Sequence, residues 1–178
     1  YMGNITDGAD LYDFEGYKIY RATDFEFNDA YNITDGDGNP TFLEPYVQNG
    51  VRAQWDLIDG KSGWHPVDLN GIKFYLGDET GLVHSYVDNN VVNGQRYYYA
   101  VVSYDYGGDL TNNIIPSDSP MKLRVNPLTG AVSLGPNVVE VVPSPPSAGF
   151  VDASFTGDQI DHVAGCLLYT SPSPRDNR

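Results

Sequence analysis

The sequence predicts an all-β fold, and three observations support that prediction. The 178 residues include 19 glycines and 12 prolines, which is typical of a chain with many turns. Aromatic residues, which are enriched in strands, make up 13% of the chain. Two segments, residues 13–24 and 93–108, combine strand-forming composition with turn-forming residues at their ends. About 150 residues bury roughly 68–70% of the unfolded surface, so one core forms without a disulfide or metal.

The segment DFEGYKIYRATD is the first expected strand. Because successive side chains of a strand point to opposite faces, its residues divide into two sets. One face carries Tyr17, Ile19 and Arg21, and the other carries Lys18, Tyr20 and Ala22.

The segment NGQRYYYAVVSYDYGG is the second expected strand, and the Asn93-Gly94 pair predicts a tight turn before it. Both faces of the strand carry bulky side chains, so we expect it to be central in a sheet. One face carries Tyr97, Tyr99, Val101 and Ser103, and the other carries Tyr98, Ala100, Val102 and Tyr104. We expect the Tyr97 face to lie inside a two-layer β stack, opposite Tyr17 and Ile19.

The pair GYKIYR and VVNGQRYYYAVVSYD resembles strands C and F of fibronectin type III domains in bacterial secreted proteins. The resemblance covers about residues 10–126 and implies an immunoglobulin-like β-sandwich. It implies that Tyr97 is the corner tyrosine, whose hydroxyl bonds to the backbone a few residues upstream. It also implies that strands A and B precede Tyr1, so the sandwich is truncated at its N-terminus, and that PSDSPMKLRVN supplies strand G.

The domain organisation expected from these signals has four parts. Residues 1–126 form the fibronectin type III-like domain, with a long insertion at about residues 25–78 and short strands near 51–57, 72–76 and 83–87. Residues 127–150 are a proline-containing linker with one β run at 137–142. Residues 151–165 begin a further β domain, and residues 166–178 are a non-native tail.

The tail prediction comes from the string CLLYTSPSPRD at residues 166–176. This string resembles the translation of the transposase end and adapter used in short-read library preparation. We therefore expect the native chain to stop near Gly165. Cys166 is the single cysteine of the sequence, so no disulfide framework or thiolate nucleophile is expected.

Charge and motifs argue against several functions. The net charge of −14 disfavours nucleic acid and anionic membranes as partners, and no apolar run approaches the roughly 18 residues of a membrane span. His65, His84 and His162 share no metal-binding spacing and are expected to be surface or turn histidines. No nucleophile motif or phosphate loop is present, so we expect a module that is not an enzyme and needs no cofactor.

Asp35, Asp37 and Asn39 alternate as the first oxygen ligands of a calcium loop do, and Glu44 is close enough in sequence to join them. Pro40 and Tyr46, however, stand where such a loop has glycine and glutamate. Two hypotheses remain open for this segment, a calcium site and a plain acidic hairpin turn.

Exposed aromatic residues suggest a second possible site. Sugar rings stack on flat aromatic side chains, and the candidate platform consists of Tyr20, Trp64, Tyr98, Tyr104 and Tyr106. The alternative is that Tyr98 and Tyr104 pack against the insertion or a neighbouring domain.

The function predicted from the sequence is a noncatalytic structural, adhesive or docking module of a larger extracellular bacterial protein. The alternative is a carbohydrate-binding accessory module of a secreted hydrolase. The expected partners are other domains of the same polypeptide, a polysaccharide or a surface protein.

Overall fold

The computed structural model describes residues 14–111, 113–121 and 123–150, and these residues form strands and no helix. The chain divides into two units, residues 1–145 and 146–178, and the second is described only over 146–150. The predictions for residues 151–165 and 166–178 lie outside the described residues. Within the part described, no helix has the length and apolarity needed to span a membrane.

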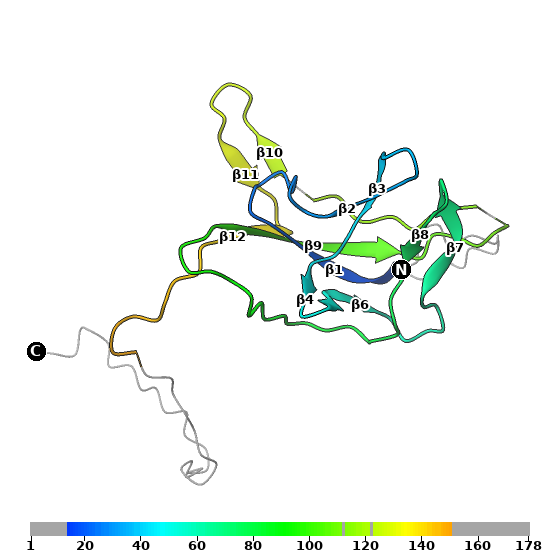
Figure 1. The fold of residues 1–178 in the computed structure, drawn as a ribbon, viewed down its shortest axis with the longest axis horizontal. Helices are drawn as coiled ribbons and strands as arrows, with labels where there is room; N and C mark the ends of the chain where they lie inside the picture. Colours follow the sequence, from blue (N-terminus) through cyan, green and yellow to red (C-terminus); the bar gives the residue numbers. More distant parts are fainter. Residues whose placement is uncertain (1–13, 112, 122, 151–178) are drawn as a thin grey trace, which may run out of the picture. The chain divides into compact units, whose positions relative to one another are not determined.

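A four-stranded antiparallel sheet forms the centre of the first unit, in the order β12-β9-β1-β6 (Figure 1). Its strands are β1 (Phe14–Ala22), β6 (Gln54–Asp56), β9 (Tyr97–Asp105) and β12 (Val138–Val141). β1 and β9 are the two strands that the sequence predicts most clearly, and their register pairs Ile19 with Val101. β9 lies between β12 and β1, so its predicted central position is confirmed.

Three hairpins from the insertion complete this region. They pair β2 (Asn32–Thr34) with β3 (Pro40–Leu43), β4 (Val47–Gln48) with β5 (Val51–Arg52), and β7 (Trp64–Leu69) with β8 (Ile72–Tyr75). The strands expected near 51–57 and 72–76 are therefore present, the first divided between β5 and β6. The strand expected at 83–87 is absent, because this described segment runs beside the sheet without ladder hydrogen bonds.

The strand beside β9 differs from the prediction. The expected strand G included Leu123 and Val125, but β10 (Leu123–Val125) pairs with β11 (Val132–Leu134) and not with β9. Two other segments run along β9: Asp118 bridges Tyr104 at one end, and β12 pairs with residues 97–100 at the other. The hairpin β10–β11 interrupts this edge of the sheet, so β12 belongs to the sheet and not to a linker that begins at residue 127.

Asn137 closes the base of the interrupting hairpin. Its side-chain amide donates to the carbonyl of Val101 on β9 at 3.3 Å and to the carbonyl of Pro120 at 3.1 Å. One side chain thus joins the segment that leads into the hairpin to the sheet at the point where β12 begins.

The core lies on one face of the sheet, which we call the closed face. Its side chains come from alternate positions of β1, β9 and β12, and the insertion and the hairpin β10–β11 cover them. The closed face consists of Lys18, Tyr20, Ala22, Tyr98, Ala100, Val102, Tyr104 and Val138. The covering side chains include Phe42, Leu43, Phe74, Leu76, Met121, Leu123 and Leu134.

The opposite face, which we call the open face, consists of Tyr17, Ile19, Trp55, Tyr97, Tyr99, Val101, Val139 and Val141. The sequence predicts Tyr17, Ile19, Tyr97, Tyr99 and Val101 to lie inside a two-layer stack. Tyr97 is buried, but the other four side chains are partly or largely exposed in the described chain, so the prediction is wrong for them. Val101 is 48% exposed, while its neighbour Val102 is 1% exposed. The insertion packs on the Lys18 side of the sheet instead, which local alternation cannot reveal because both faces are rich in aromatic residues.

Candidate functional site: an aromatic groove and a buried polar network

The open face forms one wall of a groove with a volume of about 490 Å³. The segment that follows Leu82 forms the other wall, and the rings of Trp55 and Tyr86 meet across it with centroids 5.4 Å apart. The groove is lined by Tyr17, Ile19, Trp55, Val83, His84, Ser85, Tyr86, Asp88, Tyr99 and Val101. The groove therefore offers aromatic and aliphatic surface with a few polar groups at its rim.

Asp88 anchors the second wall to the sheet. Its carboxylate accepts hydrogen bonds from Arg21 at 2.8 Å, from the Tyr99 hydroxyl at 2.8 Å and from the Tyr46 hydroxyl at 3.2 Å. Burial would raise the pKa of Asp88, but the hydrogen bonds from Asn90, Tyr99 and Arg21 outweigh it and hold the pKa below its ordinary value. Asp88 thus serves as an ionised acceptor that fixes the width of the groove.

Tyr97 lies beside this cluster, at the start of β9. Its hydroxyl accepts a hydrogen bond of 3.0 Å from the backbone N–H of Val92, five residues upstream. The Arg21 guanidinium lies 5.1 Å from the centre of its ring. This contact ties the turn at Asn93 and Gly94 to the strand.

The aromatic platform proposed from the sequence does not form as one surface. Tyr20, Tyr98 and Tyr104 are buried in the closed face, so no sugar ring can reach them. Trp64 is 58% exposed and packs against Tyr75, with ring centroids 5.0 Å apart, while Tyr106 packs on His65. The alternative interpretation was that Tyr98 and Tyr104 pack against the insertion. It is confirmed for Tyr104, because the Tyr104 ring contacts Phe74 of the insertion.

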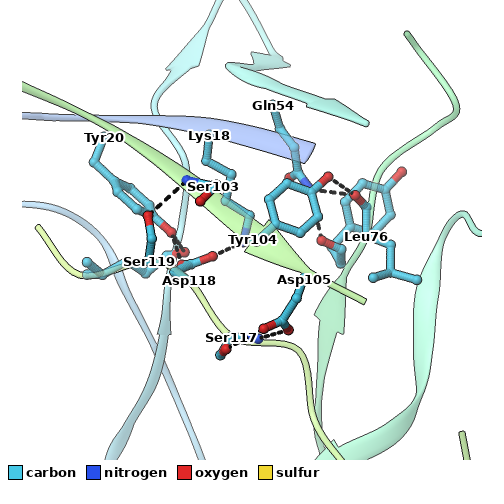
Figure 2. A network of polar contacts seen from close by, with 12 residues as sticks. Lys18, Tyr20, Gln54, Leu76, Ser103, Tyr104, Asp105, Ser117, Asp118 and Ser119 are labelled. Atoms are coloured by element: carbon cyan, nitrogen blue, oxygen red, sulfur yellow. Dashed lines mark hydrogen bonds and ion pairs between the residues drawn. The ribbon is translucent and has the colours of Figure 1, made fainter. Parts of the chain in front are cut away.

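A polar network joins β1 and β9 to residues 117–119 (Figure 2). The ammonium of Lys18 lies 3.2 Å from Oδ1 of Asp118, and the Tyr20 hydroxyl donates to Oδ2 of the same carboxylate at 2.5 Å. Lys18 also lies over the ring of Phe74, 3.6 Å from its centre. The ammonium and the phenol are thus buried, the ammonium among aromatic rings, while the Asp118 side chain is 23% exposed.

The same network continues through Gln54 and Tyr104 (Figure 2). The Gln54 amide donates to the carbonyl of Leu76 at 2.8 Å and to the Tyr104 hydroxyl at 3.1 Å, and that hydroxyl donates to the Leu76 carbonyl as well. Gly16 lies next to this point, and a Cβ there would collide with the Trp55 carbonyl and the Tyr104 ring. A residue without a side chain is therefore required where β1 crosses Tyr104.

The acidic hairpin between β2 and β3 is held by its own hydrogen bonds. Oδ1 of Asp35 accepts from the backbone N–H of Asn39 at 2.8 Å and from that of Asp37 at 3.0 Å. The bond from the Asn39 N–H is the main cause of a lowered pKa for Asp35, and the bond from the Asp37 N–H adds to it. Glu44 is paired with Arg52 at 2.6 Å, and no cluster of three or more acidic, His or Cys residues occurs in the described part of the chain. The plain hairpin turn accounts for these contacts, and calcium binding stays a hypothesis.

The histidines occupy different environments. His65 was predicted to lie at the surface or in a turn but is fully buried, with Nδ1 3.2 Å from the backbone N–H of Val67. His84 is exposed and lines the groove. His162 lies outside the described residues.

Sequence reasoning missed four residues that organise these sites. Lys18 and Asp118 are 100 positions apart and Arg21 and Asp88 are 67 apart, so no local spacing connects them. One local signal could have indicated a buried charge that needs a partner. Lys18 lies on the same strand face as Tyr20 and Ala22, which are suited to a core.

Comparison with known proteins identifies no relative of this chain. No protein-family model, no curated protein and no solved structure matches it. Its place in the fibronectin type III family therefore stays a prediction, on the residues of β1 and β9 that carry the resemblance.

Proposed function

We propose that the chain is a noncatalytic structural and docking module of fibronectin type III type, part of a larger extracellular bacterial protein. The observation that carries this proposal is the open face, an apolar sheet surface beside a bonded corner tyrosine. Three features of the structure support it, and the second and third are the two parts of that observation.

The first is the order β12-β9-β1-β6. It is the order G-F-C-C′ in which one sheet of an immunoglobulin-like sandwich is built. β12 fills the position of strand G, with the hairpin β10–β11 as an insertion before it.

The second is the bond from the Val92 N–H to the Tyr97 hydroxyl. A corner tyrosine bonds to the backbone a few residues upstream of its strand. Tyr97 has this geometry and precedes the residues that resemble strand F.

The third is the apolar character of the open face. Val101, Val139 and Val141 are exposed there on adjacent strands β9 and β12. Contiguous apolar surface of this kind marks an interaction site in soluble proteins. We propose that another β layer of the same polypeptide packs on this face and completes the sandwich.

Tryptophan accessibility tests this proposal. The chain has two tryptophans, so the substitution Trp64→Phe leaves Trp55 of the open face as the one reporter. We expect acrylamide to quench Trp55 strongly in the present chain and weakly in a chain extended by the upstream residues of its gene. Equal quenching in the two chains would contradict a covering β layer.

The groove supports one alternative function, that of a carbohydrate-binding accessory module. Tyr17, Trp55, Tyr86 and Tyr99 line a cavity large enough for a sugar ring, and aromatic faces stack on sugars. These are different residues from the platform that the sequence suggested.

A polysaccharide titration separates the alternative from the docking role. With Trp64→Phe as the background, saturable change in Trp55 emission on one polysaccharide supports sugar binding. Tyr86→Ala, in the second wall, is expected to abolish that change. A flat titration with every polysaccharide of a panel rules the alternative out.

A further inference from the structure

We propose that Lys18 and Asp118 are the partners of an intramolecular amide cross-link, formed by condensation of the Lys18 amine with the Asp118 side-chain carboxyl. This proposal is independent of the proposed function. It rests on the position of the two groups, their surroundings and the hydroxyl that binds the carboxyl.

The two reacting groups are already in contact. Nζ of Lys18 lies 3.2 Å from Oδ1 of Asp118, so the amine is in direct contact with the carboxyl group whose Cγ it would attack. Both groups are carried by the sheet region, Lys18 by β1 and Asp118 by the bridge to Tyr104 on β9. The backbone thus holds the pair in one orientation and supplies the high effective concentration that an amide bond needs.

The surroundings of Lys18 disfavour a charged ammonium. Its side chain is 4% exposed, and the rings of Phe74 and Tyr104 lie 3.6 Å and 4.8 Å from Nζ. Burial lowers the pKa of Lys18 to about 8, although Asp118 and then Glu44 act in the opposite direction and Arg52 adds to the lowering. A fraction of the neutral amine, the nucleophilic form, is therefore present near neutral pH.

The ion pair is also a costly state for this core. The Lys18 side chain is 4% exposed and that of Asp118 is 23% exposed, so the ammonium loses most of its hydration, which the attraction to Asp118 repays only in part. Condensation removes both charges and leaves a neutral amide, whose polar atoms need one partner each.

Tyr20 is placed to assist the carboxyl. Its hydroxyl donates to Oδ2 of Asp118 at 2.5 Å, and burial together with the charge of Asp118 raises the pKa of Tyr20, so the phenol keeps its proton. A donor at Oδ2 stabilises the negative charge that develops there when the amine attacks Cγ. Tyr20 is a positioning and polarising residue in this scheme.

The step balances without an outside reactant. The Nζ–Cγ bond forms and the Cγ–Oδ1 bond breaks. Oδ2 remains as the amide oxygen beside Tyr20. The ammonium first passes one proton to Oδ1 of the carboxylate, which gives the neutral amine and the carboxylic acid. On condensation Nζ gives up a second proton and keeps one, and both released protons leave with Oδ1 as one water molecule.

The cross-link would join residues 100 positions apart. It would fasten β1, which lies second from one edge of the sheet, to the segment that leads into the interrupting hairpin. A covalent bond there restricts the unfolded chain, as a disulfide over a long loop does, in a described region that has no cysteine.

Intact-mass measurement of the purified full chain tests the proposal. We expect a mass lower by one water molecule than the sequence requires, reached on incubation after folding. Trypsin cannot cleave after an amidated lysine, so digestion is expected to yield residues 1–21 joined to residues 97–122. The unmodified mass after prolonged incubation, or separate peptides ending at Lys18 and spanning 97–122, would overturn the proposal.

The mapping is essential because an Asp–Gly sequence such as Asp37-Gly38 can also lose one water as a cyclic imide. Loss of water without the joined peptides counts against the cross-link. Hydroxylamine cleaves the imide and leaves the amide intact, so treatment with it is a second way to distinguish a cyclic imide from the cross-link.

Variants sharpen the result. Asp118→Ala is expected to restore the full mass, and Tyr20→Phe, which keeps the ring, is expected to slow the loss of water at least tenfold. The matched control is Lys61→Arg, in the more exposed pair with Asp59 at 3.5 Å, which is expected to retain the mass deficit. An unchanged rate in Tyr20→Phe would remove Tyr20 from the scheme, and a mass deficit that persists in Asp118→Ala would refute the cross-link.

Discussion

The two faces of the central sheet carry similar numbers of large side chains, yet one face is buried and the other is partly exposed. On the closed face, Tyr20 and Val102 are each 1% exposed, under hairpins from the insertion and the hairpin β10–β11. On the open face, Tyr17, Ile19 and Val101 border a groove. The difference shows that strand composition sets where the sheet is, while the connections between the strands decide which side is covered.

The polar groups of the two faces differ in the same way. In the Lys18–Asp118 pair the lysine is buried against aromatic rings on the closed face, whereas the Arg21–Asp88 pair holds one wall of the groove on the open face. Burial lowers the pKa of Lys18 to about 8 in the first pair. In the second, hydrogen bonds hold the pKa of Asp88 below its ordinary value.

The largest expected effect is at the cover of the closed face. Phe74→Ala removes a buried ring that packs on Lys18, Phe42 and Tyr104, so we expect a loss of about 3–5 kcal/mol in the free energy of unfolding. Urea denaturation measures it. Tyr31→Ala, at an exposed ring, is the control and is expected to change stability by less than about 0.5 kcal/mol. Equal losses in the two variants would mean that the insertion does not cover the sheet.

Adjacent valines of β9 compare the faces directly. Val102→Ala is expected to cost about 2 kcal/mol, because two buried methyl groups are lost and a cavity remains. Val101→Ala, on the open face, is expected to cost less than about 0.5 kcal/mol. The reversed order in chemical denaturation would show that the two faces have been assigned the wrong way round.

The same pair of variants also sharpens the docking proposal. In a chain extended by the upstream residues of its gene, a covering β layer would bury Val101. The cost of Val101→Ala is then expected to rise toward that of Val102→Ala.

The anchor of the groove gives a pH-dependent effect. Because the folded pKa of Asp88 lies below the ordinary value of 3.8, the unfolded chain binds more protons between the two values, and stability rises with pH in that interval. Asp88→Asn is expected to lose about 1–2 kcal/mol at neutral pH, as hydrogen bonds to a charged group are lost. The difference from the unsubstituted chain is expected to shrink as the pH falls below 3.8.

Thermal unfolding across pH measures this difference, with Asp37→Asn in the exposed hairpin turn as the control. A difference that stays constant from neutral to acid pH would show that Asp88 does not anchor the groove as an ion.

The smallest expected effect is at the corner tyrosine. Tyr97→Phe keeps the ring and removes the acceptor of the Val92 N–H bond, so we expect a loss of about 1 kcal/mol with the fold unchanged. Circular dichroism and urea denaturation measure both quantities. Full stability in this variant would contradict a structural role for the hydroxyl.

Local residue patterns predicted β1 and β9 and the turn at Asn93 and Gly94 because strand alternation and turn chemistry depend on neighbours along the chain. They also predicted the short strands of the insertion near residues 51–57 and 72–76, but wrongly predicted one at 83–87. The strand beside β9 was predicted wrongly, because β12 and the bridge at Asp118 are separated in sequence by the hairpin β10–β11. The resemblance implied the segment around Leu123, but hydrogen bonding to β9 selected Val138–Val141.

The candidate sites were less predictable than the strands. A spacing search proposed Asp35, Asp37 and Asn39, whose oxygen and amide groups bond to one another within a hairpin. It missed Lys18 and Asp118 because their meeting depends on the packing of distant segments. The aromatic platform failed for a related reason, since three of its five rings lie on the covered side of the sheet.

The sequence by itself determined an all-β chain, its two longest strands, and the division of their side chains into two sets. The tertiary structure alone decided which set is buried, which segment completes the edge of the sheet, and which charged groups meet. The physical reason is that alternation is a property of neighbouring residues, whereas burial depends on which distant hairpins pack against a sheet that is apolar on both sides.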